Sequence, residues 1–377
     1  GTVTLSGPHQ GFAGRVVITD GVLTGNAGVG PMTIDGGAYV ASGTSNVQSI
    51  QMLAGSLSSA SDIGFRGEIR IEGDVDLLTF SGNYELSRFL DDPAPTRLSF
   101  VRDVHVADSV TVTQVGLGEI QLRGNLYVGE GVTVHNRDTQ LVDRLYPTGS
   151  NRPPDAASFT VPGRIIAAAE SASLDLTGPG TFDLAEASYE VGPGKSLTLF
   201  RDGVRTTIEI AGSANEITGA GVLGHSVEVG GGGTISPRKF APGLLTIDGD
   251  LSLNTGSRFA VELDGATRGD TFDALDVTGQ VWLRDASLSM SWQPGYIPDP
   301  SKAYVILKAK QIDGVFANAV DSIRVKNVAF PVTYLRTMVV LGNVAAIPEP
   351  GAGTLALLTI GVKACFVRFR QQPKNGS

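Results

Sequence analysis

Residues 14–25 read GRVVITDGVLTG and contain the pattern that decides the fold. Two short runs rich in branched residues, Val16–Thr19 and Val22–Thr24, are separated by Asp20-Gly21 and followed by Gly25. Valine, isoleucine and threonine favour extended backbone, whereas glycine and Asp-Gly favour tight turns. The stretch therefore predicts two short β-strands joined at a corner.

The same pattern recurs on both sides of this stretch. Residues 1–7 (GTVTLSG) precede it and residues 32–43 (MTIDGGAYVASG) follow it, so one cycle takes about 20–25 residues, a length typical of solenoid repeats. In later stretches apolar residues alternate with polar or charged ones, which predicts strands with one face buried and one in water. These stretches are Glu68–Val75, Val101–Val106, Glu119–Val128, Ser173–Leu176, Thr207–Ile210 and Val227–Val229.

The composition favours short strands over helices or disorder. The chain has 377 residues, of which 49 are glycines, and 41% are hydrophobic, 7% aromatic and 18% charged. The glycines suit frequent turns, and the hydrophobic share is too high for a disordered chain. Long amphipathic helical patterns are almost absent. We therefore predict an all-β fold.

The net charge and the cysteine content narrow the class of protein. With a formal net charge of -9, the chain lacks the positive surface that binding to nucleic-acid phosphates requires, so we expect no nucleic acid as a partner. The single cysteine, Cys365, cannot form an intrachain disulfide. Gly1 lies in the middle of a repeat-like stretch, and we therefore expect this chain to be a piece of a longer protein.

Residues 1–45 resemble the autotransporter-associated β-strand repeat. The resemblance rests on an opening strand at Val3–Ser6, a second strand at Arg15–Thr19, and the Asp20-Gly21 corner before a third strand. It implies a parallel β-helix, or solenoid, which we expect to span residues 1–235. The general preference for right-handed parallel crossovers predicts a right-handed helix.

A second resemblance covers residues 230–260. The glycine run Gly230–Gly233, the segment Thr234–Pro237 and the strand pair Leu244–Leu253 resemble a turn of autotransporter-type and PEP-CTERM proteins. Arg238-Lys239-Phe240 replaces the usual Gly-Asn-Ser there. Residues 236–343 also fit the terminal module of such proteins, and we expect them to form a β-rich cap over the open end of the solenoid. This part is richer in aromatic residues, with Trp282, Trp292, Tyr296 and Tyr304.

Residues 344–377 resemble the PEP-CTERM sorting signal. Pro348, Glu349 and Pro350 are followed by an apolar segment to Val362 and by a basic end that contains Lys363, Arg368 and Arg370. The resemblance implies that an exosortase-type membrane enzyme recognises Pro348-Glu349-Pro350. The apolar segment would form a short transmembrane helix whose basic end stays cytoplasmic. Lys363 interrupts the apolar run that family tails usually carry, but its ammonium group can reach the interface.

The tail predicts where the protein is sent. The chain would be exported and transiently anchored in the inner membrane by its C-terminus. Its destination would be the cell envelope, the outer surface or the extracellular space. An exopolysaccharide or the cell-envelope matrix is the expected class of further partner.

No residue pattern predicts a catalytic centre, a cofactor or a metal site. Gly219–Gly224 spells G-x-G-x-x-G, but the segment after it is strand-like, so a solenoid corner is expected. The turns Asp248-Gly249-Asp250 and Gly269–Asp273 are rich in carboxylates and are expected to be solvated, with incidental calcium binding as an alternative. The histidines lie far apart in the sequence, at positions His9, His105, His135 and His225.

Two functions follow from these patterns. The first is a non-enzymatic structural, adhesin-like or matrix protein that is exported and sorted by its C-terminus. The alternative is a carbohydrate-active or carbohydrate-binding β-helix. Its site would be a groove that presents Asp103 with His105, Asp175, or Arg123 near Asn125. Asn83–Pro95 and Asn136–Pro154 are predicted to be loops that leave the solenoid and are candidate partner sites.

Overall fold

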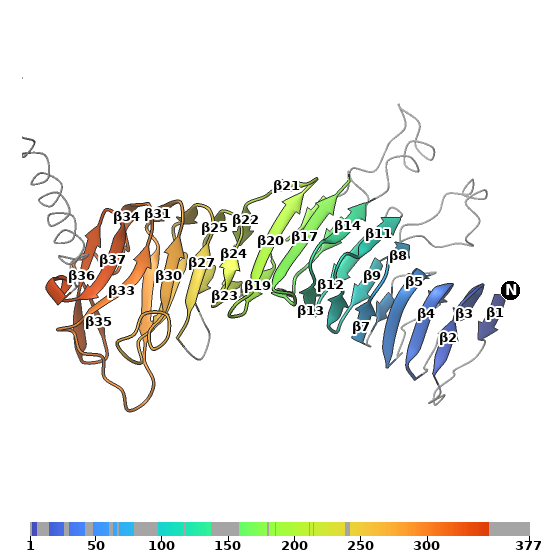
Figure 1. The fold of residues 1–377 in the computed structure, drawn as a ribbon, viewed down its shortest axis with the longest axis horizontal. Helices are drawn as coiled ribbons and strands as arrows, with labels where there is room; N and C mark the ends of the chain where they lie inside the picture. The colour runs from blue at the N-terminus through green and yellow to red at the C-terminus, as the bar shows by residue number, and fades with distance from the viewer. Residues whose placement is uncertain are drawn as a thin grey trace, which may run out of the picture.

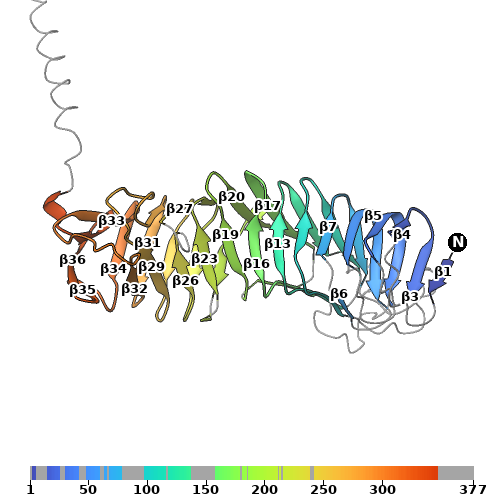
Figure 2. The same cartoon turned by 90° about the horizontal axis from the view of Figure 1, so that it is seen from below.

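The residues described here form a rod of short β-strands (Figures 1 and 2). A computed structural model describes residues 2–5, 15–25, 30–41, 48–59, 63–65, 68–78, 97–115, 118–136, 158–178, 181–184, 186–210, 212–213, 215–237 and 242–346. The predicted all-β fold is confirmed, since helical structure in this part of the chain is limited to the 3₁₀ turn η1 (Val344–Ala346). Within these same ranges, no helix is long and apolar enough to span a membrane.

Most strands pair in parallel with the strand one rung before and one rung after, as expected for a β-helix or a similar solenoid. Three faces result, and the first two belong to one 27-stranded sheet. The first face contains β2 (Val16–Ile18), the first halves of β4 (Met32–Ala41) and β5 (Ser49–Ser59), β7 (Glu68–Ile71), β10 (Val104–Val106), β13 (Asn125–Val128), β16 (Arg164–Ala167), β19 (Ser188–Val191), β23 (Glu216–Gly219), β26 (Thr234–Ser236), β29 (Arg258–Glu262) and β32 (Ser287–Ser291).

The second face runs beside the first. It contains β1 (Thr2–Leu5), β3 (Val22–Gly25), the second halves of β4 and β5, β8 (Val75–Leu78), β11 (Thr111–Val115), β14 (Val132–Asn136), β17 (Ser171–Thr177), β20 (Ser196–Arg201), β24 (Val222–Leu223), β27 (Leu244–Ile247), β30 (Ala274–Val277) and β33 (Ala303–Lys308).

The third face is divided into two five-stranded sheets. The upstream sheet contains β6 (Ile63–Phe65), β9 (Arg97–Phe100), β12 (Glu119–Leu122), β15 (Ser158–Thr160) and β18 (Thr181–Asp183). The downstream sheet contains β22 (Ile208–Ile210), β25 (Val227–Val229), β28 (Leu251–Leu253), β31 (Gln280–Arg284) and β34 (Gln311–Val315). Although β18 and β22 belong to consecutive rungs, they do not pair.

Buried side chains stack in columns along the inside of the rod. One column of the first face contains Met32, Ile50, Ile69, Val104, Leu126, Ile165, Tyr189, Ile217, Ile235, Phe259 and Leu288, each in register with the next. Removal of apolar surface from water contributes roughly 25 cal/mol per Å². Each rung therefore stabilises its two neighbours, and the alternation in the sequence selects which residues point inward.

Many aspartates at the corners hold neighbouring rungs together. The Asp103 carboxylate accepts a hydrogen bond from the Asn125 N–H at 3.1 Å. Asp108 accepts one from the Glu130 N–H at 2.7 Å, and Asp250 accepts one from the Gln280 N–H at 2.7 Å. Corner glycines allow close approach of two backbones: Gly55 has φ 99°, and a Cβ there would collide with the Gly37 carbonyl oxygen. These contacts explain much of the Asp and Gly content.

The parallel stack ends in antiparallel strands. Parallel pairing passes through residues 235 and 236 within β26 and continues to β33. There β37 (Met338–Gly342) pairs antiparallel with β33 and with β36 (Val328–Leu335), which pairs with β35 (Ser322–Val325). Figure 1 shows these strands at the end of the rod opposite to β1.

Candidate functional site

The break in the third face arises from a β-hairpin. After β20, the chain turns at Asp202 and Gly203 and returns as β21 (Val204–Arg205), antiparallel to β20. Both turn residues have positive φ, 52° and 75°, as two-residue hairpin turns require. The hairpin is tied to the preceding rung, because Gly203 N–H donates to Asp175 at 3.2 Å and Asp202 accepts from Gly178 N–H at 2.9 Å. Figure 1 shows β21 at the upper rim of the rod.

A pocket of about 290 Å³ lies at this break. Its walls come from both sides of the gap and from the second face. The lining residues are Leu176, Phe182, Asp183, Leu184, Tyr189, Leu199, Arg201, Thr206, Thr207, Ile208 and Glu209. The wall is mixed, with aliphatic and aromatic side chains next to hydroxyl and carboxylate groups. We call it the break pocket.

The edges of β18 and β22 contribute backbone groups to the break pocket. In a parallel ladder, alternate residues hydrogen-bond to opposite neighbours. Asp183 C=O accepts from Val161 N–H on the β15 side, and Ile208 N–H donates to Ser226 C=O on the β25 side. The N–H and C=O groups of Phe182 and of Glu209 therefore point in the other direction, across the gap.

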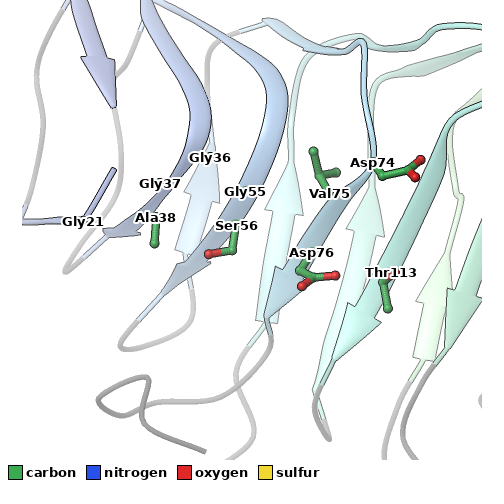
Figure 3. Close-up of a pocket in the computed structure, with 10 residues that line it drawn as sticks. All are labelled: Gly21, Gly36, Gly37, Ala38, Gly55, Ser56, Asp74, Val75, Asp76 and Thr113. Carbon is green, nitrogen blue, oxygen red and sulfur yellow. The ribbon is translucent and has the colours of Figure 1, made fainter. Parts of the chain in front are cut away.

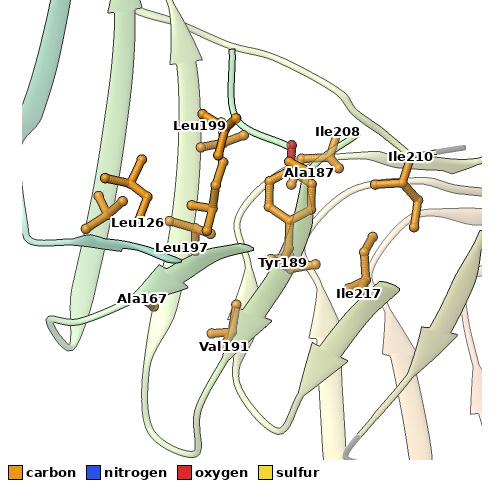
Figure 4. Packing of buried hydrophobic residues seen from close by; sticks show 14 of the residues in the cluster. Leu126, Ala167, Ala187, Tyr189, Val191, Leu197, Leu199, Ile208, Ile210 and Ile217 are labelled. Carbon is orange, nitrogen blue, oxygen red and sulfur yellow. The ribbon is translucent and has the colours of Figure 1, made fainter. Parts of the chain in front are cut away.

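Tyr189 lies at the inner end of the break pocket. Its side chain crosses the interior from β19, and its ring lies close to Leu199 and Ile208 (Figure 4). The residue is 1% exposed, and burial raises the pKa of its hydroxyl. The hydroxyl group makes no hydrogen bond to any residue that the structure describes. It is therefore a neutral donor and acceptor that faces the pocket.

Arg201 contributes little free positive charge to the break pocket. Its guanidinium donates to Leu176 C=O at 2.9 Å and to Gly178 C=O at 2.7 Å. Its Cζ atom lies 4.6 Å from the centre of the Phe182 ring, a cation–π distance. Asp183 and Glu209 are exposed at the rim. The pocket thus presents hydroxyl groups, backbone groups and carboxylates to a ligand.

A second concave surface lies near the N-terminal end of the described rod. This groove has a volume of about 430 Å³ and is lined by Gly21, Gly36, Gly37, Ala38, Gly55, Ser56, Asp74, Val75, Asp76 and Thr113. Ala38, Ser56, Asp76 and Thr113 stack in register, one on each of four successive rungs of the second face (Figure 3). The groove is shallow because its residues are small, and its Asp74 carboxylate is already bonded to the Thr111 N–H at 2.7 Å.

Most of the residues considered for a carbohydrate-active site lie near the corner between the third and first faces, whereas Asp175 lies on the second face. Asp103 and Asp175 are held by the backbone contacts described above. His105 stacks on Tyr127 with ring centres 4.3 Å apart, and its Nε2 lies 3.4 Å from Glu68. Arg123 donates to Gln121 at 2.6 Å. Each of these side chains has a local partner, and none of them lines the break pocket or the N-terminal groove.

The carboxylate turns also have structural partners. Asp248 accepts from the Thr278 hydroxyl at 3.1 Å and lies 3.5 Å from Arg205. Asp273 is 1% exposed, and its two oxygens accept from Gly243 N–H and Glu262 N–H, each at 2.8 Å. Burial raises the pKa of Asp273 to about 7, with nearby Glu262 and Asp264 adding to the effect. Within the described ranges, no three His, Cys, Asp or Glu side chains are grouped to hold a metal ion.

The other sequence predictions have mixed outcomes. Gly219–Gly224 forms the corner between β23 and β24, as predicted. His135 Nδ1 lies 2.8 Å from the Thr177 hydroxyl, and His225 is buried with its Nε2 unpaired among the described residues. The sorting residues Pro348, Glu349, Pro350, Lys363, Arg368 and Arg370 lie outside the described residues, as do His9 and most of the two predicted loops.

The sequence analysis missed the break pocket and Tyr189. One signal was available, because Asp202-Gly203 between Leu199–Arg201 and Val204–Arg205 is a strong sequence indication of a two-residue hairpin. It predicts that the solenoid is interrupted there. No protein-family model matches this sequence, and a search among curated proteins found no match.

Proposed function

We propose that this protein is a non-enzymatic, exported structural or adhesin-like component of the cell surface or extracellular matrix. The observation that supports this most directly is the unbroken parallel ladder of the first two faces. It joins strands from β1 to β33 through backbone hydrogen bonds and stacked apolar columns. Such a rod holds its outer surface rigid over its whole length, which suits a protein that presents or spaces material outside the cell.

The outer surface supports the same proposal. On the first face, Arg15 donates to the Thr33 hydroxyl at 3.0 Å and Gln51 donates to Glu72 at 2.9 Å. On the third face, Arg97 lies 2.6 Å from Glu119. Side chains of successive rungs thus bond to one another along the rod and stiffen its surface. The hand of the coil is proposed to be right-handed, from the general preference for such crossovers.

The proposed division of the chain follows from the sequence resemblances. Residues 1–235 would carry the repeats, and residues 236–343 would form a C-terminal module whose antiparallel strands close the stack. Residues 344–377 would be the PEP-CTERM-like sorting tail with a short transmembrane helix. An exosortase-type enzyme would recognise Pro348-Glu349-Pro350, while Lys363, Arg368 and Arg370 would mark the cytoplasmic side.

An enzymatic role has weaker support. The acids considered for it, Asp103 and Asp175, accept hydrogen bonds that hold rungs together, and Arg123 donates to Gln121 on its own rung. A catalytic acid pair would instead need two carboxyl groups facing one bound sugar at a defined separation. The non-enzymatic proposal therefore accounts for more of the polar side chains.

Rod length offers a test of the structural role. Deletion of residues 227–250 would bring Leu251 into the position of Val227, with which it is in register, and would remove one rung. In the native host, the shortened protein should be exported and should restore only part of the cell-to-matrix adhesion that is lost in a deletion strain. Full adhesion with the shortened rod, or adhesion that depends on a single acid with measurable glycan turnover, would contradict the proposal.

The sorting role has a separate test. Replacement of Pro348-Glu349-Pro350 by three alanines should leave the rod folded and cause a full-length, membrane-retained precursor to accumulate in the native host. Two prolines keep a peptide extended and remove backbone donors, so this tripeptide suits recognition as an exposed segment. Normal cleavage and export of the alanine variant would show that the tail is not a sorting signal.

A further inference from the structure

The break pocket contains a polar group, the Tyr189 hydroxyl, that makes no hydrogen bond to any residue that the structure describes. The inward column of the first face is aliphatic at its neighbouring positions, with Ile165 before Tyr189 and Ile217 after it. A phenylalanine would fill the same space without burying a hydroxyl group. The Tyr189 hydroxyl is not among the fully buried polar atoms that lack a partner, so its oxygen reaches the open space of the pocket. It is therefore placed to form a hydrogen bond with a ligand there.

The buried Tyr304 and the half-buried Tyr334 show the usual arrangement. Tyr304 accepts a hydrogen bond from Asp299 N–H at 3.1 Å. Tyr334 donates to Ala319 C=O at 2.8 Å and accepts from Phe316 N–H at 3.1 Å. Tyr189 differs because its hydroxyl faces the cavity between two unpaired strand edges. The difference is local to the break, which is where the fold leaves room for a ligand.

The pocket wall indicates the chemistry of the ligand. Backbone N–H and C=O groups of Phe182 and Glu209 and the hydroxyls of Tyr189, Thr206 and Thr207 supply both donors and acceptors. A ligand that matches them must itself offer both, as sugar hydroxyls do. The half-buried side chains of Phe182 and Leu184 provide an apolar surface for the C–H face of a ring. The volume of about 290 Å³ lies at the small end of ligand pockets and suits a single ring.

The charges of the pocket argue against an acidic ligand. Asp183 and Glu209 place two carboxylates at the rim, and the Arg201 guanidinium is already bonded to two carbonyl groups and to the Phe182 ring. A uronate, sulfate or phosphate would meet the Glu209 carboxylate, and Arg201, the one cationic residue among the described residues that line the pocket, is already engaged. A neutral sugar avoids this cost.

We propose that the break pocket between β18 and β22 binds one neutral sugar residue of a glycan, with the Tyr189 hydroxyl as its innermost hydrogen-bonding group. The site goes beyond the structural role proposed above and does not depend on it. It would fix the rod to a polysaccharide at a defined position along its length.

Isothermal titration calorimetry on the full chain tests this assignment. The probes are short oligomers of glucose, galactose, mannose and N-acetylglucosamine, with oligogalacturonate as the acidic comparison. At least one neutral oligomer should bind, and oligogalacturonate should bind at least about tenfold more weakly. Tyr189→Phe should weaken the neutral ligand about tenfold or more, the effect of one lost hydrogen bond that is worth about 1.4 kcal/mol.

Two further variants make the test specific. Tyr127→Phe removes a tyrosine hydroxyl from the outer first face, away from the pocket, and should leave sugar affinity unchanged. Glu209→Gln should reduce the preference for neutral over acidic oligomers. The assignment is overturned if no neutral oligomer binds, which would mean that only water occupies the pocket. Unchanged affinity in Tyr189→Phe or a preference for oligogalacturonate would also overturn it.

Discussion

The regular parallel pairing between rungs is interrupted at two places, in the third face at the break and at the closing end of the rod. The two places differ in structure. At the break, β18 and β22 leave their facing edges unpaired around a pocket. At the closing end, antiparallel strands β35 to β37 cover the last rungs. The break interrupts only the third face, the closing end terminates the parallel stack, and only the closing end is sealed.

The closing end is sealed by aromatic packing. The Phe272 and Tyr304 rings meet edge to face with centres 5.4 Å apart, and Phe330 lies 6.3 Å from Tyr304 and 6.4 Å from Trp292. Phe272, Tyr304 and Phe330 are at most 1% exposed. At the break, by contrast, Phe182 is half-buried and is covered on one side by Arg201. The closing end is therefore packed for stability, whereas the break leaves the open pocket for which we propose a ligand.

The largest expected effect comes from removing an aromatic ring at the closing end. Phe330→Ala should reduce the free energy of unfolding by about 3–5 kcal/mol, the usual cost of a buried Phe-to-Ala change. Phe182→Ala at the break should cost much less, because its ring is only half-buried. Urea denaturation with regional hydrogen exchange measures both losses. Equal losses at the two sites would remove the distinction between them.

The two places should also respond oppositely to pH. Burial raises the pKa of Asp273, near the closing end, from 3.8 to about 7. The folded state therefore holds this proton more tightly than the unfolded state. The resulting stabilisation is complete below pH 3.8 and is lost as the pH rises through about 7. Burial lowers the pKa of His225, just before β25, from 6.5 to about 4. Its contribution is present above pH 6.5 and is lost as the pH falls through about 4.

Regional hydrogen exchange at pH 5 and pH 8, corrected for intrinsic exchange rates, checks this prediction. Strands β29 and β30 should be better protected at pH 5, whereas β22 and β25 should be better protected at pH 8. Each unit of pKa displacement corresponds to about 1.4 kcal/mol at most. His225→Gln should abolish the second trend and leave the first. A uniform response of all strands would contradict the assignment to these two residues.

A smaller effect separates the half-buried Tyr334 from the buried Tyr189. Tyr334→Phe at the closing end removes the partner of Ala319 C=O and of Phe316 N–H and should cost about 1–3 kcal/mol. Tyr189→Phe at the break removes a hydroxyl without a protein partner, so thermal unfolding of the ligand-free protein should be unchanged or slightly improved. A loss of equal size in Tyr189→Phe would indicate that the hydroxyl is bonded within the protein.

The smallest effect is expected on the outer surface of the third face. Glu119→Gln upstream of the break removes the ion pair with Arg97, whose side chain is 50% exposed. Exposed pairs of this kind contribute about 0.2–1 kcal/mol. The downstream counterpart, Glu228→Gln, disturbs a 2.6 Å hydrogen bond from Asn254 and should have a similarly small effect. Salt should reduce the difference between wild type and Glu119→Gln, and a loss above about 2 kcal/mol would be inconsistent with an exposed pair.

The local sequence was sufficient to predict that these segments form strands and which side of each strand is buried. In Glu119–Val128, the alternation correctly places Ile120, Leu122, Leu126 and Val128 in the core. It did not reveal that Arg123 and Gly124 form a corner that divides the segment between the third and first faces. Because both strands keep the same alternation, the pattern by itself does not show the bend.

The sequence by itself determined an all-β chain with short strands, glycine and aspartate corners and inward apolar columns, because these depend on residues close in sequence. Only the tertiary structure decided which rungs stack, since rung length varies. Residues bonded across neighbouring rungs are 22 apart for Asp108 and Glu130, 37 for Asp74 and Thr111, and 42 for Gly131 and Ser173. Longer connections cost little additional loop entropy, so spacing does not fix the pairing. The break pocket also depends on the stacking of rungs, because Tyr189 lines a pocket only when β18 and β22 are stacked without pairing.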